Sequence, residues 1–262
     1  MWSVRVLVCA VVVIVSSGRT GVAATEYIQL VTPEDTIDTV ISEVILREAY
    51  GRIGIGVDIV KVPAERALIM ADRGNVDGEV QRIDGINKKY TNLVQVYPSI
   101  NFIEAAVFSS EASFRVDGWE SLRPYTIGLV RGIKFAENNT ADMDVYPAPD
   151  YEHLIAMLIG ERVDIFVSPG VNGLYHISRL GVEGINRLEP SVMRFDLFHY
   201  IHKSRQGLIE KITPVLESMA ASGELARIRN HVVSTLIEQA SRGQSVCDDT
   251  YACFSPYGQA VN

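Results

Sequence analysis

Charged side chains follow a predicted strand in each half of the chain, and together they could hold a small anion. In "VDGEVQRI", Glu79 and Arg82 lie towards the end of a predicted strand. In "YTIGLVRGIKFAE", Arg131 and Lys134 flank Gly132 between a predicted strand and a predicted helix start. An arginine can bind a carboxylate through two parallel hydrogen bonds, and a helix N-terminus offers free N–H groups to an anion. The sequence therefore predicts ligand-binding roles for these five residues, with Gly132 letting the backbone approach the ligand.

Each of these two clusters also has a purely structural interpretation. Arg82 could be occupied by an internal ion pair with one of the three acids that lie close to it in sequence. These acids are Asp77, Glu79 and Asp84. The charges beside Gly132 could simply face solvent around a turn.

Three further residues are predicted to line the same site. Tyr97 and Phe102 could form aromatic walls for a ligand, although either could belong to a core. Glu34 lies with Asp35 in a loop after the first predicted strand, at the edge where a cleft would open. In that loop, Asp35 or Thr36 could instead act as the N-cap of the following helix.

The elements that must position these residues alternate between strand and helix. Apolar residues recur at helical spacing in some segments and form short continuous runs in others, with Gly and Pro at the boundaries. The predicted order is strand 26–32, helix 36–54, strand 55–62, helix 63–74 and strand 76–83. This alternation predicts an α/β fold with mainly parallel strands.

A second alternating unit follows the first and is linked to it by two strands. It runs from residue 119, with strands at 125–132, 144–150 and 162–168 and helices at 134–139 and 151–161. Strands near 104–110 and 193–201 lead out of the first unit and back into it, and long helices fill 207–243. We therefore predict two lobes joined by a two-strand hinge, with lobe 1 formed by 25–108 and 199–245, lobe 2 by 109–198, and a C-terminal tail by 246–262.

Asp77 and Asp164 occupy equivalent places in the two units. Each precedes an inner strand and follows a helix that ends at a glycine, in "ADRGNVDG" and "LIGERVD". We expect both carboxylates to tie loops at the strand starts and not to contact the ligand.

Residues 1–24 have the pattern of a cleaved secretory signal peptide. A basic residue at Arg5 precedes an apolar run from Val6 to Val15, and small residues lead to "VAA". An uncleaved N-terminal anchor is the alternative, although an apolar run of about ten residues is short for a membrane span. The sequence therefore predicts an exported protein.

The charge of the exported chain limits its partners. Without residues 1–24 it carries 22 basic and 32 acidic side chains, a formal charge of −10. Such a balance disfavours nucleic acids and anionic membrane surfaces as partners, but it leaves a small anionic ligand open.

Two cysteines remain in the exported chain, in "CDDTYAC" near the C-terminus. In an exported protein, a local disulfide between Cys247 and Cys253 is the favoured interpretation. Zinc is the weaker alternative because two thiols with no nearby histidine supply too few ligands. His199 and His202 are three residues apart on a predicted strand and should point to opposite faces, so no metal site is expected there either.

Several stretches resemble one family of bacterial receptors. "VPAERALIMADRGNVDGEVQRI" followed by "NLVQVYPSI", together with "YTIGLVRGIKFAE" and "LIAMLIGERVDIFVS", resembles the family 3 extracellular solute-binding proteins, over roughly residues 26–240. The resemblance implies the two-lobe type II fold of periplasmic binding proteins, in which lobe 1 is discontinuous and a hinge closes both lobes on the ligand. It implies a periplasmic monomer without cofactor or catalysis, which binds a small-molecule ligand and serves an ABC permease in the inner membrane.

The chain departs from this family at two positions that bind amino-acid ligands. Where members typically carry a Thr-x-x-Arg-like motif, this chain reads "GINKKY", with Lys88 or Lys89 near the arginine position. Where members commonly have an acid for the ligand ammonium, this chain has Ser168, in "FVSPG". Ser168 is therefore a predicted ligand-binding residue, and a neutral or anionic solute is as open as an α-amino acid.

Two other functions fit the same scaffold. A periplasmic dehydratase-like enzyme would need an acid–base residue with a shifted pKa in the cleft, and Glu79, Glu34 and Lys134 are the candidates. A sensory module would have to signal through a separate membrane protein. No diagnostic catalytic motif accompanies the candidates, so a binding protein that is not an enzyme is the preferred prediction.

Overall fold

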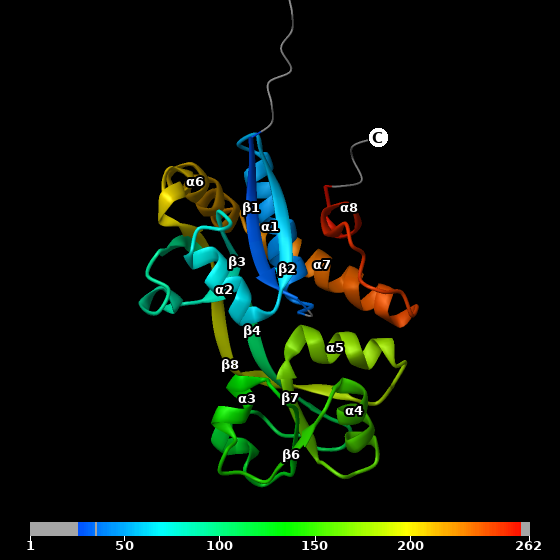
Figure 1. The fold of residues 1–262 in the computed structure, drawn as a ribbon. Helices are drawn as coiled ribbons and strands as arrows, with labels where there is room; N and C mark the ends of the chain where they lie inside the picture. Colours follow the sequence, from blue (N-terminus) through cyan, green and yellow to red (C-terminus); the bar gives the residue numbers. More distant parts are fainter. Residues whose placement is uncertain (1–25, 35, 258–262) are drawn as a thin grey trace, which may run out of the picture.

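Two long antiparallel strands connect two lobes in the computed structural model, which describes residues 26–34 and 36–257 (Figure 1). β4 (Leu93–Ser109) and β8 (Asn186–His202) are paired from Leu93 opposite His202 to Ser109 opposite Asn186, with two shifts in register. Both strands run through the whole molecule, so the strands of both lobes join one sheet in the order β2-β1-β3-β8-β4-β7-β5-β6. The predicted two-lobe α/β fold with a two-strand hinge is confirmed.

Lobe 1 contains three parallel strands and most of the helices. Its elements are β1 (Glu26–Pro33), α1 (Thr39–Gly51), β2 (Ile55–Val62), α2 (Ala64–Asp72), β3 (Gly78–Ile83), α6 (Gly207–Ala221) and α7 (Glu224–Ser241). β2 and β3 pair in parallel with the two sides of β1, so the loops after all three strands meet at one edge. Apolar side chains of α1, α6 and α7 form the largest buried cluster with one face of this sheet.

Lobe 2 repeats the arrangement with shorter elements. They are β5 (Ile127–Val130), α3 (Lys134–Asn139), β6 (Val145–Ala148), α4 (Tyr151–Ile159), β7 (Ile165–Pro169) and α5 (Gly170–Arg179). β6 and β7 pair in parallel with β5, which brings the N-termini of α4 and α5 to one edge of the sheet. Two smaller clusters of buried apolar residues lie on the two sides of this sheet.

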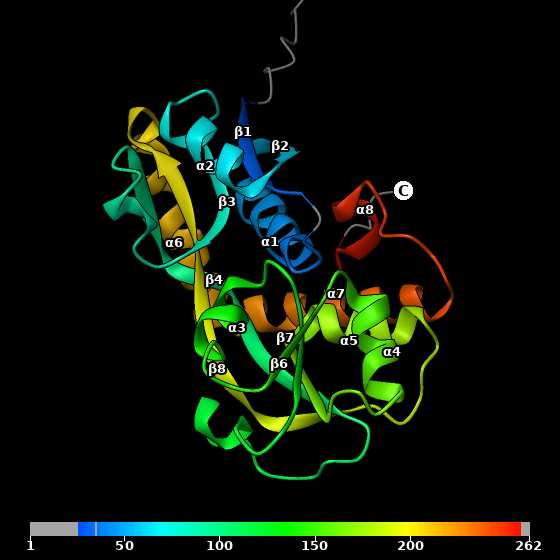
Figure 2. The same ribbon diagram turned by 60° about the horizontal axis from the view of Figure 1, so that its bottom comes forward.

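One helix links the two lobes in addition to the hinge strands. α5 belongs to lobe 2 but packs beside α7 of lobe 1 (Figure 2). Its Val171 is buried within the apolar cluster of lobe 1. The position of α5 therefore sets how the two lobes face each other on this side of the molecule.

The two equivalent aspartates, one in each lobe, have the structural role that the sequence predicts. Asp77 accepts a hydrogen bond from the backbone N–H of Gln29, with Oδ2 2.8 Å from the nitrogen. Asp164 accepts hydrogen bonds from the backbone N–H and the hydroxyl of Thr126, both at 2.7 Å. Each carboxylate thus joins the start of its own strand to a neighbouring segment of the same lobe.

Four elements differ from those predicted from the sequence. α5 is not among the predicted helices because Pro169, Gly170 and Gly173 give its sequence the composition of a loop. β4 begins at Leu93, well before the strand predicted near residues 104–110, and β8 begins at Asn186, well before the predicted start at residue 193. A short helix, α8 (Thr250–Phe254), lies in the predicted tail.

The membrane-related predictions concern mostly residues outside the described range. The predicted signal peptide at 1–24 lies outside the described residues. Within 26–34 and 36–257, none of the helices combines the length and the apolar character that a membrane span requires.

Candidate functional site

A groove of about 710 Å³ lies between the two lobes, and we call it the interlobe groove. Lobe 1 contributes residues around the start of α1, among them Thr36 and Thr39, and Lys61 of β2. Lobe 2 contributes Tyr151 at the start of α4 and one face of α5. The segment 245–248 forms a third wall. This volume is within the range of roughly 300–1,000 Å³ that is usual for small-molecule sites.

Local sequence features fix the two helices on the lobe 2 side of the groove. The carboxylate of Asp150 caps α4 by accepting a hydrogen bond from the N–H of His153 at 2.9 Å. α5 lies very close to the sheet because Gly173 has no side chain. A Cβ at that position would lie 2.5 Å from the ring of Phe108 and 2.7 Å from Oγ of Ser168. The glycine therefore allows α5 to approach β4 and β7 and to present its other face to the groove.

Two polar atoms of lobe 2 in the groove are buried without a hydrogen-bond partner among the described residues. They are the hydroxyl of Tyr151 and Oδ1 of Asn172. Burial raises the pKa of Tyr151 above its usual range and Asp38 raises it further, while the nearby side chains of Asn172 and Ser168 oppose the rise. The hydroxyl therefore stays protonated. Because an unpaired buried polar group costs about 1–3 kcal/mol, these atoms favour a ligand or water that completes their hydrogen bonds.

An imidazole and a guanidinium complete the lobe 2 wall. The ring of His176 stacks on Tyr151 at 4.2 Å with an interplanar angle of 7°. Burial lowers the pKa of His176 to about 4, and Arg179 lowers it as well, so the ring is neutral at pH 7. Arg179 is exposed in the groove and forms no ion pair with any residue that the structure describes. The wall therefore offers neutral hydrogen-bonding groups and one positive charge.

The cation on the opposite wall is already neutralised. Lys61 of lobe 1 forms an ion pair with Glu43 at 3.0 Å, and the side chain of Glu43 is only 1% exposed. Arg179 is therefore a stronger candidate than Lys61 for an anionic group of a ligand.

A second, very small cavity of about 10 Å³ lies at the hinge. It is lined by Asp38, Phe102 and Arg229, together with the first residues of α5. Burial raises the pKa of Asp38, and burial lowers the pKa of Arg229 to about 10. Phe102 lies between the guanidinium groups of Arg194 and Arg229, each 3.7 Å from its ring centre. The cavity has room for about one water molecule and not for a solute.

Arg82 and Glu79 form the internal ion pair that was one of the two predicted alternatives. Nε of Arg82 lies 3.0 Å from Oε1 of Glu79, and the arginine also donates a hydrogen bond to the carbonyl of Ala64. Glu79 is fully buried, and burial raises its pKa to about 7 although Arg82 opposes this rise. Neither residue lines the interlobe groove, and their predicted contact with ligand stays a prediction.

The loop around Gly132 holds a carboxylate of its own. Gly132 has a φ of +91°, and its N–H donates a hydrogen bond to Oε1 of Glu137 at 2.7 Å. Lys134 forms an ion pair with the other oxygen of Glu137 at 2.6 Å. These contacts lower the pKa of Glu137, with Lys134 as the larger cause. Glu137 thus fills the anion position that the sequence assigned to a ligand, while Arg131 is exposed.

The other predicted site residues lie at separate places. Tyr97 is 58% exposed and packs edge-on against Phe198. Ser168 is fully buried, and its hydroxyl donates to the carbonyl of Pro169 at 3.1 Å. Glu34 lies exposed in the turn after β1. Of the nine predicted residues, only Phe102 lines a cavity described above, and the ligand roles of the others stay predictions.

The predicted helix cap also needs correction. α1 begins at Thr39 with Asp38 as its flanking residue, so Thr36 is not its N-cap. Thr36 instead donates a hydrogen bond to the carbonyl of Pro33. The alternative prediction for Asp35 lies outside the described residues.

No metal site is formed by the side chains that the structure describes. Nowhere in 26–34 and 36–257 do three histidine, cysteine, aspartate or glutamate side chains gather in a way that could hold an ion. His199 is fully buried and hydrogen-bonded to Tyr50, whereas His202 contacts Ser204. The predicted opposite orientation of the two histidines is confirmed.

The groove residues Tyr151 and Asn172 were not predicted from the sequence. Tyr151 follows the capping aspartate in "APDYEH". Asn172 lies in "SPGVNG", where the two glycines lower the helix propensity so that no helix was predicted. The available signal was positional, because both residues begin helices that follow parallel strands, and such helix starts line the ligand-binding edge of α/β sheets.

Comparisons with known proteins agree with this architecture. No protein-family model matches the chain. An uncharacterized protein of Shewanella oneidensis is 23% identical over 210 residues, which cover 76% of this chain and 78% of that protein. The second substrate-binding domain of GlnP from Lactococcus lactis, solved in an open conformation, has a TM-score of 0.60 at 14% identity. The similarity covers 85% of this chain and 98% of that domain.

A sensor domain has the same fold. A histidine kinase sensor domain with similarity to periplasmic binding proteins has a TM-score of 0.58 at 16% identity, covering 79% of this chain and 96% of that domain. At these identities the similarities show the fold alone. The chain therefore has the type II periplasmic-binding-protein fold.

Proposed function

We propose that this protein is an exported solute-binding protein that captures a small polar ligand in the interlobe groove. One observation carries the proposal: both lobes line a groove of ligand size, and the hydroxyl of Tyr151 and the amide oxygen of Asn172 are buried in it without partners among the described residues. A ligand held by both walls would favour closure of the lobes, because its binding energy is greatest when both contact it.

The groups in the groove favour an amino-acid-like or anionic solute. Arg179 can bind a carboxylate, and the tyrosine hydroxyl, asparagine amide and neutral imidazole of His176 can donate or accept hydrogen bonds. The GlnP domain is described as a substrate-binding domain, which supports the same class of function for this chain. We infer that the protein acts in the periplasm and delivers its ligand to an ABC permease of the inner membrane.

A ligand-sensing role is the second candidate. It is supported by the similar histidine kinase sensor domain, which has the same fold and comparable coverage. In that role the protein would bind a separate membrane partner in its closed form.

A thermal-shift screen of residues 25–262 tests the proposal. The compounds are amino acids, dicarboxylates, aromatic acids and small peptides. A ligand at 100 times its Kd stabilises the folded protein by about 2.7 kcal/mol, which gives a measurable rise in melting temperature. Absence of any stabilising compound would refute the proposal.

Substitutions of groove residues test whether the ligand identified in the screen binds in the interlobe groove. Asn172→Ala and Tyr151→Phe should abolish or greatly reduce the shift, because each removes a group from the groove. Tyr146→Phe is the matched control, since Tyr146 is exposed on β6 and does not line the groove. An equal shift in all three variants would place the ligand elsewhere.

A further inference from the structure

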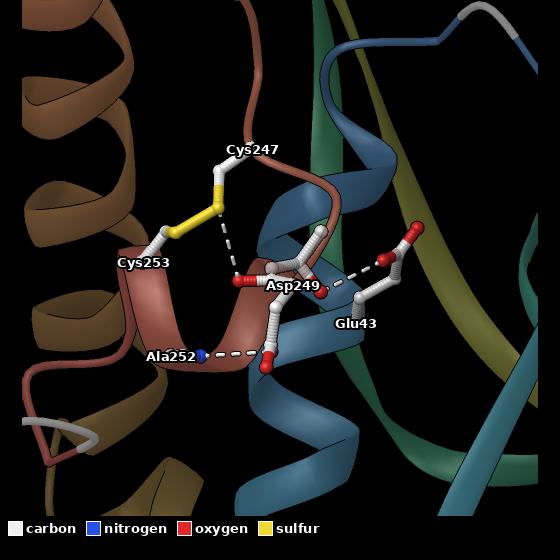
Figure 3. The surroundings of a disulfide bond; sticks show 6 residues. Glu43, Cys247, Asp249, Ala252 and Cys253 are labelled. Carbon is white, nitrogen blue, oxygen red and sulfur yellow. Dashed lines mark hydrogen bonds between the residues drawn. A yellow bond between two sulfur atoms is a disulfide. The ribbon is translucent and has the colours of Figure 1, made fainter.

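The chain beyond α7 folds back onto lobe 1 and forms a compact segment, 244–257, which we call the C-terminal clasp. The disulfide between Cys247 and Cys253 closes a loop that contains most of α8 (Figure 3). Asp249 caps α8 by accepting a hydrogen bond from the N–H of Ala252 at 3.1 Å. The clasp is therefore an ordered part of the fold with its own covalent closure.

One half of the clasp is anchored to the helices of lobe 1. Phe254 is fully buried in the apolar cluster of α1 and α7. The hydroxyl of Thr250 donates to the buried carboxylate of Glu43 at 3.0 Å, and the hydroxyl of Tyr251 donates to Glu48 at 2.6 Å. These contacts fix residues 250–254 on lobe 1.

The other half of the clasp lines the interlobe groove. Residues 245–248 form the wall that complements α1 of lobe 1 and α4 and α5 of lobe 2. Asp248 is exposed there, and its carboxylate forms no ion pair with the described residues. The lobe 2 wall carries the unpaired cation Arg179, so the described residues that line the groove provide one free charge of each sign.

We propose that the C-terminal clasp is part of the ligand site, with Asp248 binding a cationic group of the ligand and the disulfide holding this wall in place. The proposal rests on the proposed function and specifies its ligand: a zwitterion whose carboxylate meets Arg179 and whose ammonium meets Asp248. It also accounts for a departure noted in the sequence, since Ser168 stands where an acid for the ammonium was expected. The acid comes instead from the opposite side of the groove.

The disulfide links the fixed half of the clasp to the half that lines the groove. A dithiol reductant would break the bond between the two sulfurs by thiol–disulfide exchange; the protein gains two electrons and two protons as two thiols, and the reductant becomes a disulfide. Residues 250–254 would keep their anchors on lobe 1, while 245–248 would lose their tie to Cys253. Because the closed loop is short, its reduction should change the groove far more than global stability.

Matched probes test the role of Asp248. L-Glutamate is compared with glutarate, and L-aspartate with succinate, so that each pair differs only in the ammonium group. The unmodified protein should bind the amino acid of a pair more tightly, and Asp248→Asn should weaken that binding by about tenfold or more while leaving the deaminated partner unaffected. Asp117→Asn, the same charge change at an exposed residue of lobe 2 outside the groove, should change neither.

An unchanged preference for the amino acid in Asp248→Asn would overturn the proposal. If neither probe pair nor any other compound binds the unmodified protein, the proposed function fails instead, and hydrogen exchange still tests the clasp. In Cys247→Ser/Cys253→Ser, or after reduction with dithiothreitol, amide exchange should increase at 36–40 and 172–179 and stay unchanged in β5. Unchanged exchange at both groove segments would show that the disulfide does not hold this wall.

Discussion

Asp77→Ala tests whether the aspartate at the start of β3 is structural. Asp77 accepts a hydrogen bond from the backbone N–H of Gln29 at 2.8 Å and forms an ion pair with Arg205 at 3.0 Å. It thereby joins β1 to the start of β3 and to the segment after β8. The substitution removes both contacts and leaves the ligand groove untouched, since Asp77 does not line it.

The expected loss of stability follows from the two contacts. A hydrogen bond to a charged group contributes about 1.5–3 kcal/mol, whereas a partly exposed ion pair contributes about 0–1 kcal/mol. The side chain of Asp77 is 24% exposed and that of Arg205 is 36% exposed, so the ion pair belongs to the weak class. We therefore expect Asp77→Ala to lower the free energy of unfolding by about 2–3 kcal/mol. In a chain of this length that corresponds to a fall in Tm of roughly 5–10 °C.

Urea denaturation of Asp77→Ala and two comparison variants measures this loss. Asp164→Ala, the equivalent change in lobe 2, should cost a similar amount because it removes two hydrogen bonds to Thr126. Asp58→Ala removes a single exposed contact with the side chain of Gln29 and should cost less than about 0.5 kcal/mol. Asp77 is not structural if Asp77→Ala is no more destabilising than Asp58→Ala, or if it weakens ligand binding without loss of stability.

Three other substitutions probe buried groups. Burial raises the pKa of Glu79 from 4.5 to about 7, so between these values the folded state retains a proton that the unfolded state releases. The free energy of unfolding should therefore fall as pH rises through this window. In Glu79→Gln, denaturation at several pH values should show a smaller fall. An equal dependence on pH in both proteins would contradict this. Gly173→Ala should cost about 1–3 kcal/mol in thermal denaturation, because its Cβ would overlap Phe108, whereas Gly207→Ala, which meets nothing within 4 Å, should be nearly neutral. Tyr151→Phe should not destabilise the ligand-free protein, since its hydroxyl forms no hydrogen bond of good geometry with the described residues; a loss above about 1 kcal/mol would show that the nearby side chain of Asn172 or Ser168 stabilises it.

The fold could be predicted because its signals are local. Helices such as α1 end at a glycine, and the next strand begins a few residues later, so the alternation is visible in the sequence. Asp77 and Asp164 each precede an inner strand after a helix that ends at a glycine, and this repeat indicates two similar lobes. α5 could not be predicted, because Gly170 and Gly173 lower helix propensity, and the reason for Gly173 is the close packing of the helix against Phe108.

The candidate site was less predictable because free and paired charges look alike in a sequence. Lys134 was predicted to meet a ligand, but Glu137, one helical turn later, occupies it. Arg82 is likewise held by Glu79 across a bulge in β3. The groove residues come from the start of α1, from β2, α4 and α5, and from the C-terminal clasp. Their proximity depends on strand order and on a reversal of the chain after α7 that no local pattern specifies.

NMR mapping of a bound compound on the ¹⁵N-labelled protein, residues 25–262, shows directly whether the ligand binds between the two lobes. The compound is whichever member of the thermal-shift panel stabilises the protein most. If the interlobe groove is the ligand site, amide resonances change on both of its sides, at 36–40 in lobe 1 and at 172–179 in lobe 2. Changes confined to one lobe, or changes around Arg131 and Arg82 with none in the groove, would contradict it.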